Sequence, residues 1–484
     1  MQKYHVDAAC GNDRNSGLSP TLAWKTLARA IRQPLKPGDS LLFKRGETWK
    51  GSLVIRGSGT KAYPIQIGTY GPGPRPRIMS TGRFILSNDG PVSWWRISGL
   101  DLSGARPHDP RLAGLGDSHG ITIRSDRPCK GIAINNCIIH DISGTGISFS
   151  NTGGAGRAFE SWSITGCEVY NAGTGITSHG PWPAQVDAVD CHKRFRVVGC
   201  RTHDTATDGI VLSHCRDGVI EHCTAWRTGI GLTRRTPVGI WFFLAYRCTI
   251  QFSESFDNHC AGGKADGGGF DLDGGCIDCT MQYNYSHDND GAGFLICSYD
   301  PKNAPCTGCV TRFNLSVNDG RVNDYPAILF WQAYDCLTYN NTCITRVSSP
   351  LKFTSETSGH LVANNIFMVD SSLDIPLVKS AYAVDSNIFR NNLYFRAGGS
   401  ARFEVRAQQG LDMAGFTRLV QSKGDFEGNP RISGRTMLDL LPPGEPKCQR
   451  GGIMVTGNGG RDLFGGIIGG KSRPPVGCVL PKKR

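Results

Sequence analysis

Acidic side chains gather in a glycine-rich stretch from Asn258 to Ser298, which reads NHCAGGKADGGGFDLDGGCIDCTMQYNYSHDNDGAGFLICS. Paired carboxylates can act as acid and as base or nucleophile at a glycosidic bond. The intervening glycines let a ligand approach the backbone closely. We therefore take this stretch as the candidate active site. Its ionisable residues include His259, Lys264, Asp266, Asp271, Asp273, His287 and Asp288.

Asp271 and Asp273 alternate with Phe270 and Leu272, as in a β-strand with one buried face. The apolar pair must point inward, so both carboxylates are expected on the solvent face, about 6.5–7 Å apart at twice the rise per residue. Carboxyl groups about 5–5.5 Å apart suit a retaining glycosidase, and groups about 6.5–9.5 Å apart an inverting one. Rotamers span both ranges, so the stereochemistry stays open. Such proximity also raises the pKa of one carboxyl, as a general acid requires.

Other residues can complete a site around this pair. Asp266, in the loop that enters the strand, is a third catalytic candidate. Trp241 and Trp331 are expected to face outward on adjacent turns, where they can stack on sugar rings. The other candidate substrate-binding residues are Lys264, His287 and Asp208.

Structural explanations compete at several of these positions. Asp266 and Asp208 each precede a glycine, and Asp-Gly pairs are ordinary turn chemistry. His287 belongs to a His-Asp pair that recurs at His140 and His203, so a corner role is as well supported as catalysis. For the aspartate pair on the strand, the alternatives are a calcium site or plain solvated acids.

A short strand of the form Gly-apolar-x-apolar recurs about every 24–34 residues, the length of one solenoid turn with variable loops. A second recurring strand has one slot filled by cysteine and later by serine or asparagine. Residues of this kind can stack along a solenoid axis, with asparagines forming hydrogen-bonded ladders. The slot holds Cys137, Cys167, Cys200, Cys223, Ser253, Asn284, Asn314, Asn341 and Asn365.

A further set of cysteines lies five residues before that slot and should stack as small buried side chains. Two CxxC pairs, Cys276–Cys279 and Cys306–Cys309, are explained by this register. A zinc site would instead need its ligands to converge at one point. Cys448 and Cys478 lie off the repeat and are the best disulfide candidates. The stacking set is Cys248, Cys279, Cys309 and Cys336.

The N-terminal region has helical spacing from Trp24 to Ile31, followed by a turn and an apolar strand at Ser40–Phe43. Its motifs GNDRNSGLSPTLAWKTLARA and PGDSLLFKRGETW resemble the entrance of the pectin-lyase-like superfamily. The resemblance implies an all-β fold, a single-stranded right-handed parallel β-helix (solenoid) with an N-terminal capping helix and a loop-rich C-terminal tail. Such a cap covers apolar core and free strand edges.

Three segments follow from these patterns. Residues 1–75 are expected to form the cap and first coils, 76–396 the β-helix coils with the active-site groove, and 397–484 the closing segment. With Gly 63, Pro 26 and only 19% charged residues among 484, the composition also favours a turn-rich β protein.

The net charge of +12 favours acidic polysaccharides, while the dispersed basic residues argue against nucleic acid. The opening residues MQKYHVDAACG lack the apolar segment of a signal peptide, and no run is long enough to span a membrane. We expect a poly- or oligosaccharide substrate, no nucleic-acid or membrane partner, and an extracellular or periplasmic protein whose signal peptide is absent from this sequence.

The two-aspartate pattern is similar to β-helix glycoside hydrolases, including those of the lacto-N-biosidase type. This similarity implies acid/base hydrolysis that requires no cofactor, with Asp273 and either Asp271 or Asp266 in the two roles. The same stretch also resembles the calcium-and-lysine region of one pectate lyase family. Here Asp271 follows Phe270 and no lysine comes after it, so a lyase would rely on calcium or on Lys264. A non-catalytic glycan-binding solenoid is the third hypothesis.

Overall fold

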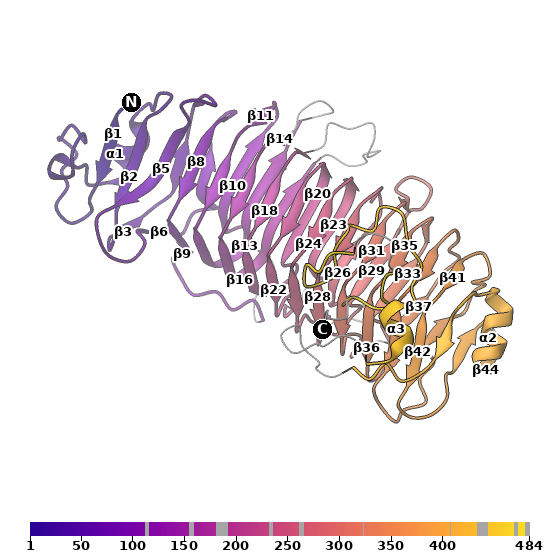
Figure 1. Ribbon diagram of the computed structural model, residues 1–484. Coiled ribbons are helices and arrows are strands. Elements are labelled where there is room, and N and C mark those ends of the chain that lie inside the picture. Colours follow the sequence, from indigo (N-terminus) through magenta and orange to yellow (C-terminus); the bar gives the residue numbers. More distant parts are fainter. Residues whose placement is uncertain are drawn as a thin grey trace. The chain divides into compact units, whose positions relative to one another are not determined.

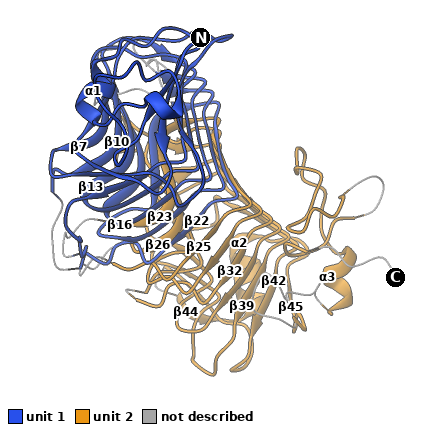
Figure 2. Ribbon diagram, turned by 90° about the vertical axis from the view of Figure 1, so that its left-hand side faces the viewer, with its two compact units in different colours: residues 1–234 blue, residues 235–484 orange. Residues whose placement is uncertain are grey.

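Parallel β-strands are the main regular structure of the protein, shown as a computed structural model in Figure 1. The structure describes residues 1–111, 116–153, 159–180, 192–231, 236–260, 266–322, 324–406, 408–432, 444–468 and 473–479. The chain forms two compact units, Met1–Arg234 and Arg235–Arg484, coloured separately in Figure 2. The three segments predicted from sequence remain a prediction.

The chain passes through three strand positions in each turn, and each strand pairs in parallel with its counterpart one turn later. We call the three stacks of equivalent strands the first, second and third ladders. In unit 1 the first ladder contains β1 (Lys3–Val6), β2 (Ser40–Lys44), β5 (Ile65–Tyr70), β8 (Trp95–Ser98), β12 (Ala133–Asn135), β15 (Ser163–Thr165), β18 (Arg196–Val198) and β21 (Val219–Glu221).

The other two ladders of unit 1 share the long strands β13 (Ile138–Asn151) and β16 (Glu168–His179), which run through both. The second also has β3 (Thr48–Lys50), β6 (Arg77–Ser80), β9 (Asp101–Gly104), β19 (Arg201–Thr205) and β22 (Thr224–Trp226). The third also has β4 (Leu53–Ile55), β7 (Phe84–Asn88), β10 (His119–Ser125) and β20 (Ile210–Arg216). Short strands β11 (Cys129–Lys130), β14 (Phe159–Glu160) and β17 (His192–Lys193) pair beside them.

Unit 2 repeats the pattern. Its first ladder contains β24 (Thr249–Gln251), β27 (Thr280–Gln282), β31 (Val310–Arg312), β35 (Leu337–Tyr339), β38 (Leu361–Ala363) and β41 (Ile388–Arg390). Its second contains β25 (Glu254–Phe256), β28 (Tyr285–His287), β32 (Leu315–Val317), β36 (Thr342–Thr345), β39 (Ile366–Val369), β42 (Leu393–Arg396) and β45 (Phe426–Glu427).

The third ladder of unit 2 carries the candidate site. It contains β23 (Val238–Tyr246), β26 (Gly268–Leu272), β29 (Phe294–Cys297), β33 (Ile328–Trp331), β37 (Leu351–Phe353), β40 (Val378–Ser380) and β43 (Phe403–Val405). Strand β44 (Gln408–Leu411) adds to β43 in antiparallel orientation, and β30 (Cys306–Thr307) pairs with β34 (Ala333–Tyr334).

The predicted capping helix is confirmed, but it begins later than expected. Helix α1 spans Leu27–Arg32 and packs against β4. Thr26 caps it, because its hydroxyl accepts a hydrogen bond from the Arg29 N–H. This start turns Ala30 inward and leaves Ala28 exposed. The described helices are completed by η1 (Pro20–Leu22), α2 (Met413–Val420) and α3 (Pro446–Arg450), and none has the length and apolarity that a membrane span requires.

Buried asparagines hold successive turns of unit 2 in register, as predicted from the repeat. Each side-chain N–H donates to the side-chain oxygen one turn on, at 3.0–3.2 Å. The chain of bonds ends at Asp425, and a shorter one from Asn258 through Asn289 ends at Asp319. The longer ladder runs Asn284, Asn314, Asn341, Asn365, Asn392, Asp425.

The recurring cysteines are stacked and buried, as the register predicted. In unit 1, for example, Cys167 and Cys200 direct their thiols to carbonyls of the preceding turn. The predicted Cys448–Cys478 disulfide is wrong, because both are buried free thiols. The tail that carries them packs on apolar side chains that point outward from the second ladder, including Leu315. The C-terminal tail is therefore held against the second ladder by apolar contacts.

The buried carboxyl of Asp319 gives unit 2 a pH-dependent stability. Burial raises its pKa to about 6, although the Ser316 hydroxyl and the Asn289 amide donate to it. An aspartate with a raised pKa contributes stability in full below the unfolded value of 3.8 and loses it as the pH rises through about 6. About two pKa units correspond to roughly 3 kcal/mol.

We predict that Asp319→Asn weakens the fall in the free energy of unfolding between pH 4 and pH 7. The asparagine keeps an acceptor for Asn289 and has no charge to desolvate. Urea denaturation of both proteins across this range measures the difference. An identical pH slope in the two proteins would contradict the role of Asp319.

Candidate active site

The predicted aspartate pair lies on the outward side of β26, with Asp271 in the strand and Asp273 just after its last residue. Phe270 and Leu272 are fully buried in the interior, and Asp271 and Asp273 lie on the opposite side of the strand, so the predicted alternation is confirmed. In the ladder register, Asp271 pairs with Trp241 of β23 on one side and with Leu295 of β29 on the other. Parallel stacking thus places an aromatic ring and an aliphatic side chain on either side of this carboxylate.

The predicted solvent exposure of Asp271 is wrong. Only 3% of the residue is exposed, whereas Asp273 is partly exposed. Strand alternation gives the face, but neighbouring turns lie only about 4.8 Å apart, so large side chains on that face cover one another. The pair therefore consists of the partly exposed carboxylate of Asp273 beside the buried carboxylate of Asp271.

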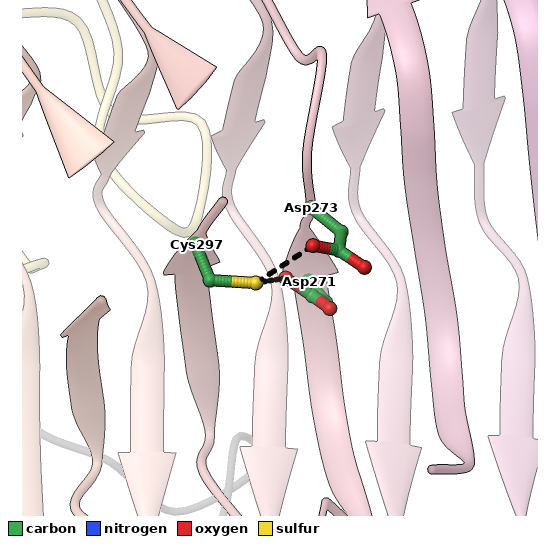
Figure 3. Close-up of side chains that lie close together, drawn as sticks. All are labelled: Asp271, Asp273 and Cys297. Atoms are coloured by element: carbon green, nitrogen blue, oxygen red, sulfur yellow. Dashed lines mark hydrogen bonds between the residues drawn. The ribbon is translucent and has the colours of Figure 1, made fainter. Parts of the chain in front are cut away.

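Cys297, at the end of β29, joins the two aspartates (Figure 3). Its Sγ lies 2.9 Å from Oδ1 of Asp273 and 3.8 Å from Oδ1 of Asp271. Burial, followed by the negative charges of the two aspartates, raises the pKa of the thiol well above its ordinary value. The thiol therefore stays protonated and donates a hydrogen bond to the nearer carboxylate, that of Asp273.

Burial raises the pKa of Asp273 despite two hydrogen bonds that oppose this effect. The Cys297 thiol and the Gly274 N–H, at 2.6 Å, both donate to Oδ1. A carboxyl group with a raised pKa can carry a proton at a pH where ordinary aspartates are ionised. Asp273 therefore has the property required of a general acid.

Metal-binding chemistry at this cluster is constrained by its donors. Within the described ranges, Asp271, Asp273 and Cys297 are the group whose potential ligand atoms lie within 4.8 Å of one another. Calcium takes six to eight oxygen ligands, so two carboxylates and a thiol do not fit it. Softer metals would first have to displace the thiol proton.

A cavity of about 470 Å³ in unit 2 is lined by Leu295, which pairs in register with Asp271. Its floor is formed by Leu295, Leu329 and Trp331, which lie on the outward faces of β29 and β33. Trp331 pairs in register with Cys297 and is 40% exposed, so its predicted outward position is confirmed. The lining residues are Thr236, Asp266, Leu295, Asp324, Tyr325, Pro326, Leu329, Trp331, Lys352 and Thr354.

Asp266 lines this cavity next to Tyr325. The Tyr325 hydroxyl donates to Oδ1 of Asp266 at 3.3 Å and accepts from its backbone N–H at 3.1 Å. Burial and the charge of Asp266 raise the pKa of this hydroxyl. The phenol thus stays protonated and orients the Asp266 carboxylate.

Lys352 and Asp324 line the cavity together. Lys352 and Lys379, neighbours in the ladder, both bind one oxygen of Asp324, at 2.8 and 2.7 Å. The two ammonium groups hold the pKa of Asp324 below its ordinary value even though burial acts in the opposite direction. The cavity thus offers charged, hydroxyl and aromatic groups together, a combination that can bind sugar hydroxyls and ring faces.

Tyr299 is a site residue that the sequence did not reveal. It is 42% exposed, and its ring packs on Gly274, where an added Cβ would lie 2.7 Å from the ring. Burial of its hydroxyl and the charge of Asp273 raise its pKa. Tyr299 follows β29 in an irregular loop, so the repeat assigned it no face. Tyr325 was missed for the same reason.

Of the remaining predicted residues in unit 2, Trp241 flanks the pair and His287 lies on another ladder. His287 is on the second ladder, in β28, stacked on Phe256 and hydrogen-bonded to Asp288. Asp208 belongs to unit 1, where its carbonyl accepts from the Gly175 N–H. Lys264 falls outside the described residues. Trp241 is partly buried, stacks on Phe243 and flanks Asp271.

The family model of the right-handed β-helix region matches residues 119–314. The chain is a right-handed parallel β-helix protein. The predicted fold is thereby confirmed. The crystal structure of a GH136 lacto-N-biosidase from Eubacterium ramulus superposes with a TM-score of 0.58 at 18% identity, covering 88% of this chain and 68% of that one.

Two curated proteins are similar in sequence to this β-helix. A lacto-N-biosidase of Bifidobacterium longum subsp. longum is 25% identical over 470 residues, covering 75% of this chain. An alpha-1,3-galactosidase A of Akkermansia muciniphila is 41% identical over 88 residues, or 18% of this chain. The matches span 28% and 14% of the lengths of these relatives.

We predict a stabilising corner role for His287. Burial alone would lower its pKa, but hydrogen bonds to Asp288 and Glu254 outweigh burial and raise the pKa to about 9. The charged imidazole therefore stabilises the fold fully below about pH 6.5, and this stabilisation is lost as the pH rises through about 9. His287→Gln should lower the free energy of unfolding by about 1–2 kcal/mol at pH 6 and by much less at pH 9.5.

Chemical denaturation at the two pH values tests this prediction. His259→Gln is the matched control, because His259 forms ion pairs with Asp257 and Asp290 but is more exposed to solvent. We expect a smaller effect at His259. A loss at His287 that is the same at both pH values would contradict the charge-based role.

Proposed function

We propose that this β-helix is a carbohydrate-active enzyme that hydrolyses glycosidic bonds of a poly- or oligosaccharide. The observation that carries the proposal is the carboxyl pair Asp271 and Asp273 on the outward side of β26, where Asp271 pairs in register with Leu295, a residue that lines the cavity together with Trp331. Similarity to a lacto-N-biosidase and to an alpha-1,3-galactosidase supports hydrolysis. An extracellular or periplasmic location is part of the same proposal.

The spacing of the pair favours a retaining reaction. One oxygen of Asp271 and one of Asp273 lie within 4.8 Å of each other, so the two carboxyls are near enough for the separation of about 5–5.5 Å found in retaining enzymes. An inverting enzyme needs about 6.5–9.5 Å to place a water between its carboxyls. Asp271, buried beside a protonated thiol, is assigned the nucleophile, and Asp273, with its raised pKa, the acid.

The reaction then proceeds in two balanced steps. An Asp271 oxygen bonds to the anomeric carbon while the bond to the glycosidic oxygen breaks, and Asp273 gives its proton to that oxygen. In the second step Asp273 takes a proton from water, whose oxygen displaces Asp271 from the anomeric carbon. Both carboxyls return to their starting states.

Asp266 is assigned to substrate binding. It lines the cavity, but β26 lies between it and Asp273, and five extended residues span about 16 Å. Two carboxyls at the ends of such a strand are too far apart to share one glycosidic bond. A carboxylate held by Tyr325 can instead accept hydrogen bonds from sugar hydroxyls.

A lyase reaction is the alternative, and one observation supports it. Tyr325 and Lys352, both capable of proton transfer, line the same cavity. β-Elimination from a uronate gives an unsaturated sugar that absorbs ultraviolet light, whereas hydrolysis gives a reducing end without it. A glycan-binding protein would give neither product.

We predict that Asp273→Asn and Asp271→Asn each lower kcat by about a thousandfold or more, because each removes a group that acts in bond cleavage. Asp266→Asn should mainly raise KM. Digestion of a panel of neutral, amino-sugar and uronate glycans identifies the substrate, and NMR of the first product gives its anomeric form.

The exposed Asp278, on the same turn, supplies the control variant Asp278→Asn, which should keep full activity. Thermal melting shows that each variant is folded. Full activity of Asp273→Asn would overturn the proposal. Inactivation by Asp266→Asn together with an active Asp271→Asn would overturn the roles assigned to both residues and the distance argument that separates Asp266 from Asp273.

A further inference from the structure

Cys297 lies in an apolar patch but makes polar contacts with two aspartates. It packs with Ala292, Leu295 and Leu329 on the outward face of the third ladder. A cysteine in such a position could be exchanged for an aliphatic residue with little loss of packing, since free cysteine behaves as a small hydrophobe. Its thiol instead points back across one rung to the two carboxyls (Figure 3).

Geometry decides which carboxyl accepts the hydrogen bond from the Cys297 thiol. A thiol has one proton to donate, and the Sγ–Oδ1 distance is 2.9 Å to Asp273 and 3.8 Å to Asp271. The Gly274 N–H donates to the same Oδ1 of Asp273. Asp273 thus has two donors on one oxygen, which fix its orientation and leave Oδ2 free to carry the acid proton.

We propose that Cys297 is a positioning residue of the reaction: its thiol holds the Asp273 carboxyl in place and stabilises the carboxylate left when Asp273 gives up its proton. This inference rests on the acid role assigned to Asp273 under the proposed function. An acid that must release a proton in one step and recover it in the next needs its two states to be close in free energy. Burial alone favours the protonated state, and the thiol offsets part of that preference.

Few other groups face Asp273 from the elements packed around it. Among the described residues, its own strand supplies Asp271 and the Gly274 N–H, and β29 with the following loop supplies Cys297 and Tyr299. Tyr299 and Cys297 both stay protonated, because burial and the acidic charges raise the pKa of each. Removal of the thiol therefore removes the side-chain hydrogen bond that Asp273 accepts from Cys297.

The test compares Cys297→Ala with Cys297→Ser. Without the thiol donor the pKa of Asp273 should rise, and the alkaline limb of the kcat profile should move up by about one pH unit. The kcat at the optimum should fall about 10- to 100-fold, with KM little changed. Serine keeps a donor and should return the limb towards its wild-type position.

Cys279→Ala is the matched control. Cys279 is a buried cysteine just before β27, and its thiol donates to the Ala245 carbonyl. This variant also loses a buried thiol, but one directed to a backbone carbonyl, and it should melt at a lower temperature with an unshifted pH profile. A shift of the limb in Cys279→Ala equal to that in Cys297→Ala would reduce Cys297 to a packing role and overturn the inference.

A second readout does not depend on turnover. Carboxyl-carbon NMR of the aspartate-labelled protein, with Asp273→Asn to assign the signal, follows the titration of Asp273 directly. A higher pKa in Cys297→Ala but not in Cys279→Ala supports the inference, even if no glycan is cleaved and the proposed function fails. An unchanged Asp273 titration in Cys297→Ala overturns it.

Discussion

The alignment of each turn on the one before it determines where every functional side chain lies. In unit 2 this alignment is maintained by backbone pairing and by a ladder of buried asparagines, each bonded to its equivalent in the next turn. An unpaired amide in the interior would cost about 1–3 kcal/mol, so a slip by one residue is heavily penalised. A slip would also send Asp271 and Asp273 inward and Leu272 outward. The site is therefore a direct product of register.

Register also explains how much of the fold and site could be predicted. The repeat gave the strand positions, the stacked cysteines, the asparagine ladder and the outward side of Asp271 and Asp273, because strand side chains alternate with a period of two. It could not give the burial of Asp271, which depends on the size of neighbours such as Trp241 and Leu295 one turn away. Cys297 occupied a recognised outward slot, but its direction towards the carboxyls is a rotamer that spacing does not specify.

Irregular segments were the main source of missed residues. Tyr299 and Tyr325 lie in loops that follow and precede strands of the third ladder, where loop length varies from turn to turn. The disulfide expected between Cys448 and Cys478 failed for a related reason. The two cysteines were paired because both lie off the repeat, whereas the tail covers apolar outward side chains of the second ladder and buries both as free thiols. Both errors concern contacts made by segments without periodicity.

The asparagine ladder has a direction, and its last member sets a boundary. Every asparagine passes one N–H forward and accepts one from behind, but Asp425, like Asp319, only accepts when ionised. A solenoid can lengthen in evolution by duplicating a turn, and here a new turn would extend the longer ladder only ahead of Asp425. A copy inserted beyond Asp425 would begin without an N–H from the preceding turn. The end of the longer asparagine ladder is thus recorded in the chemistry of one terminal side chain.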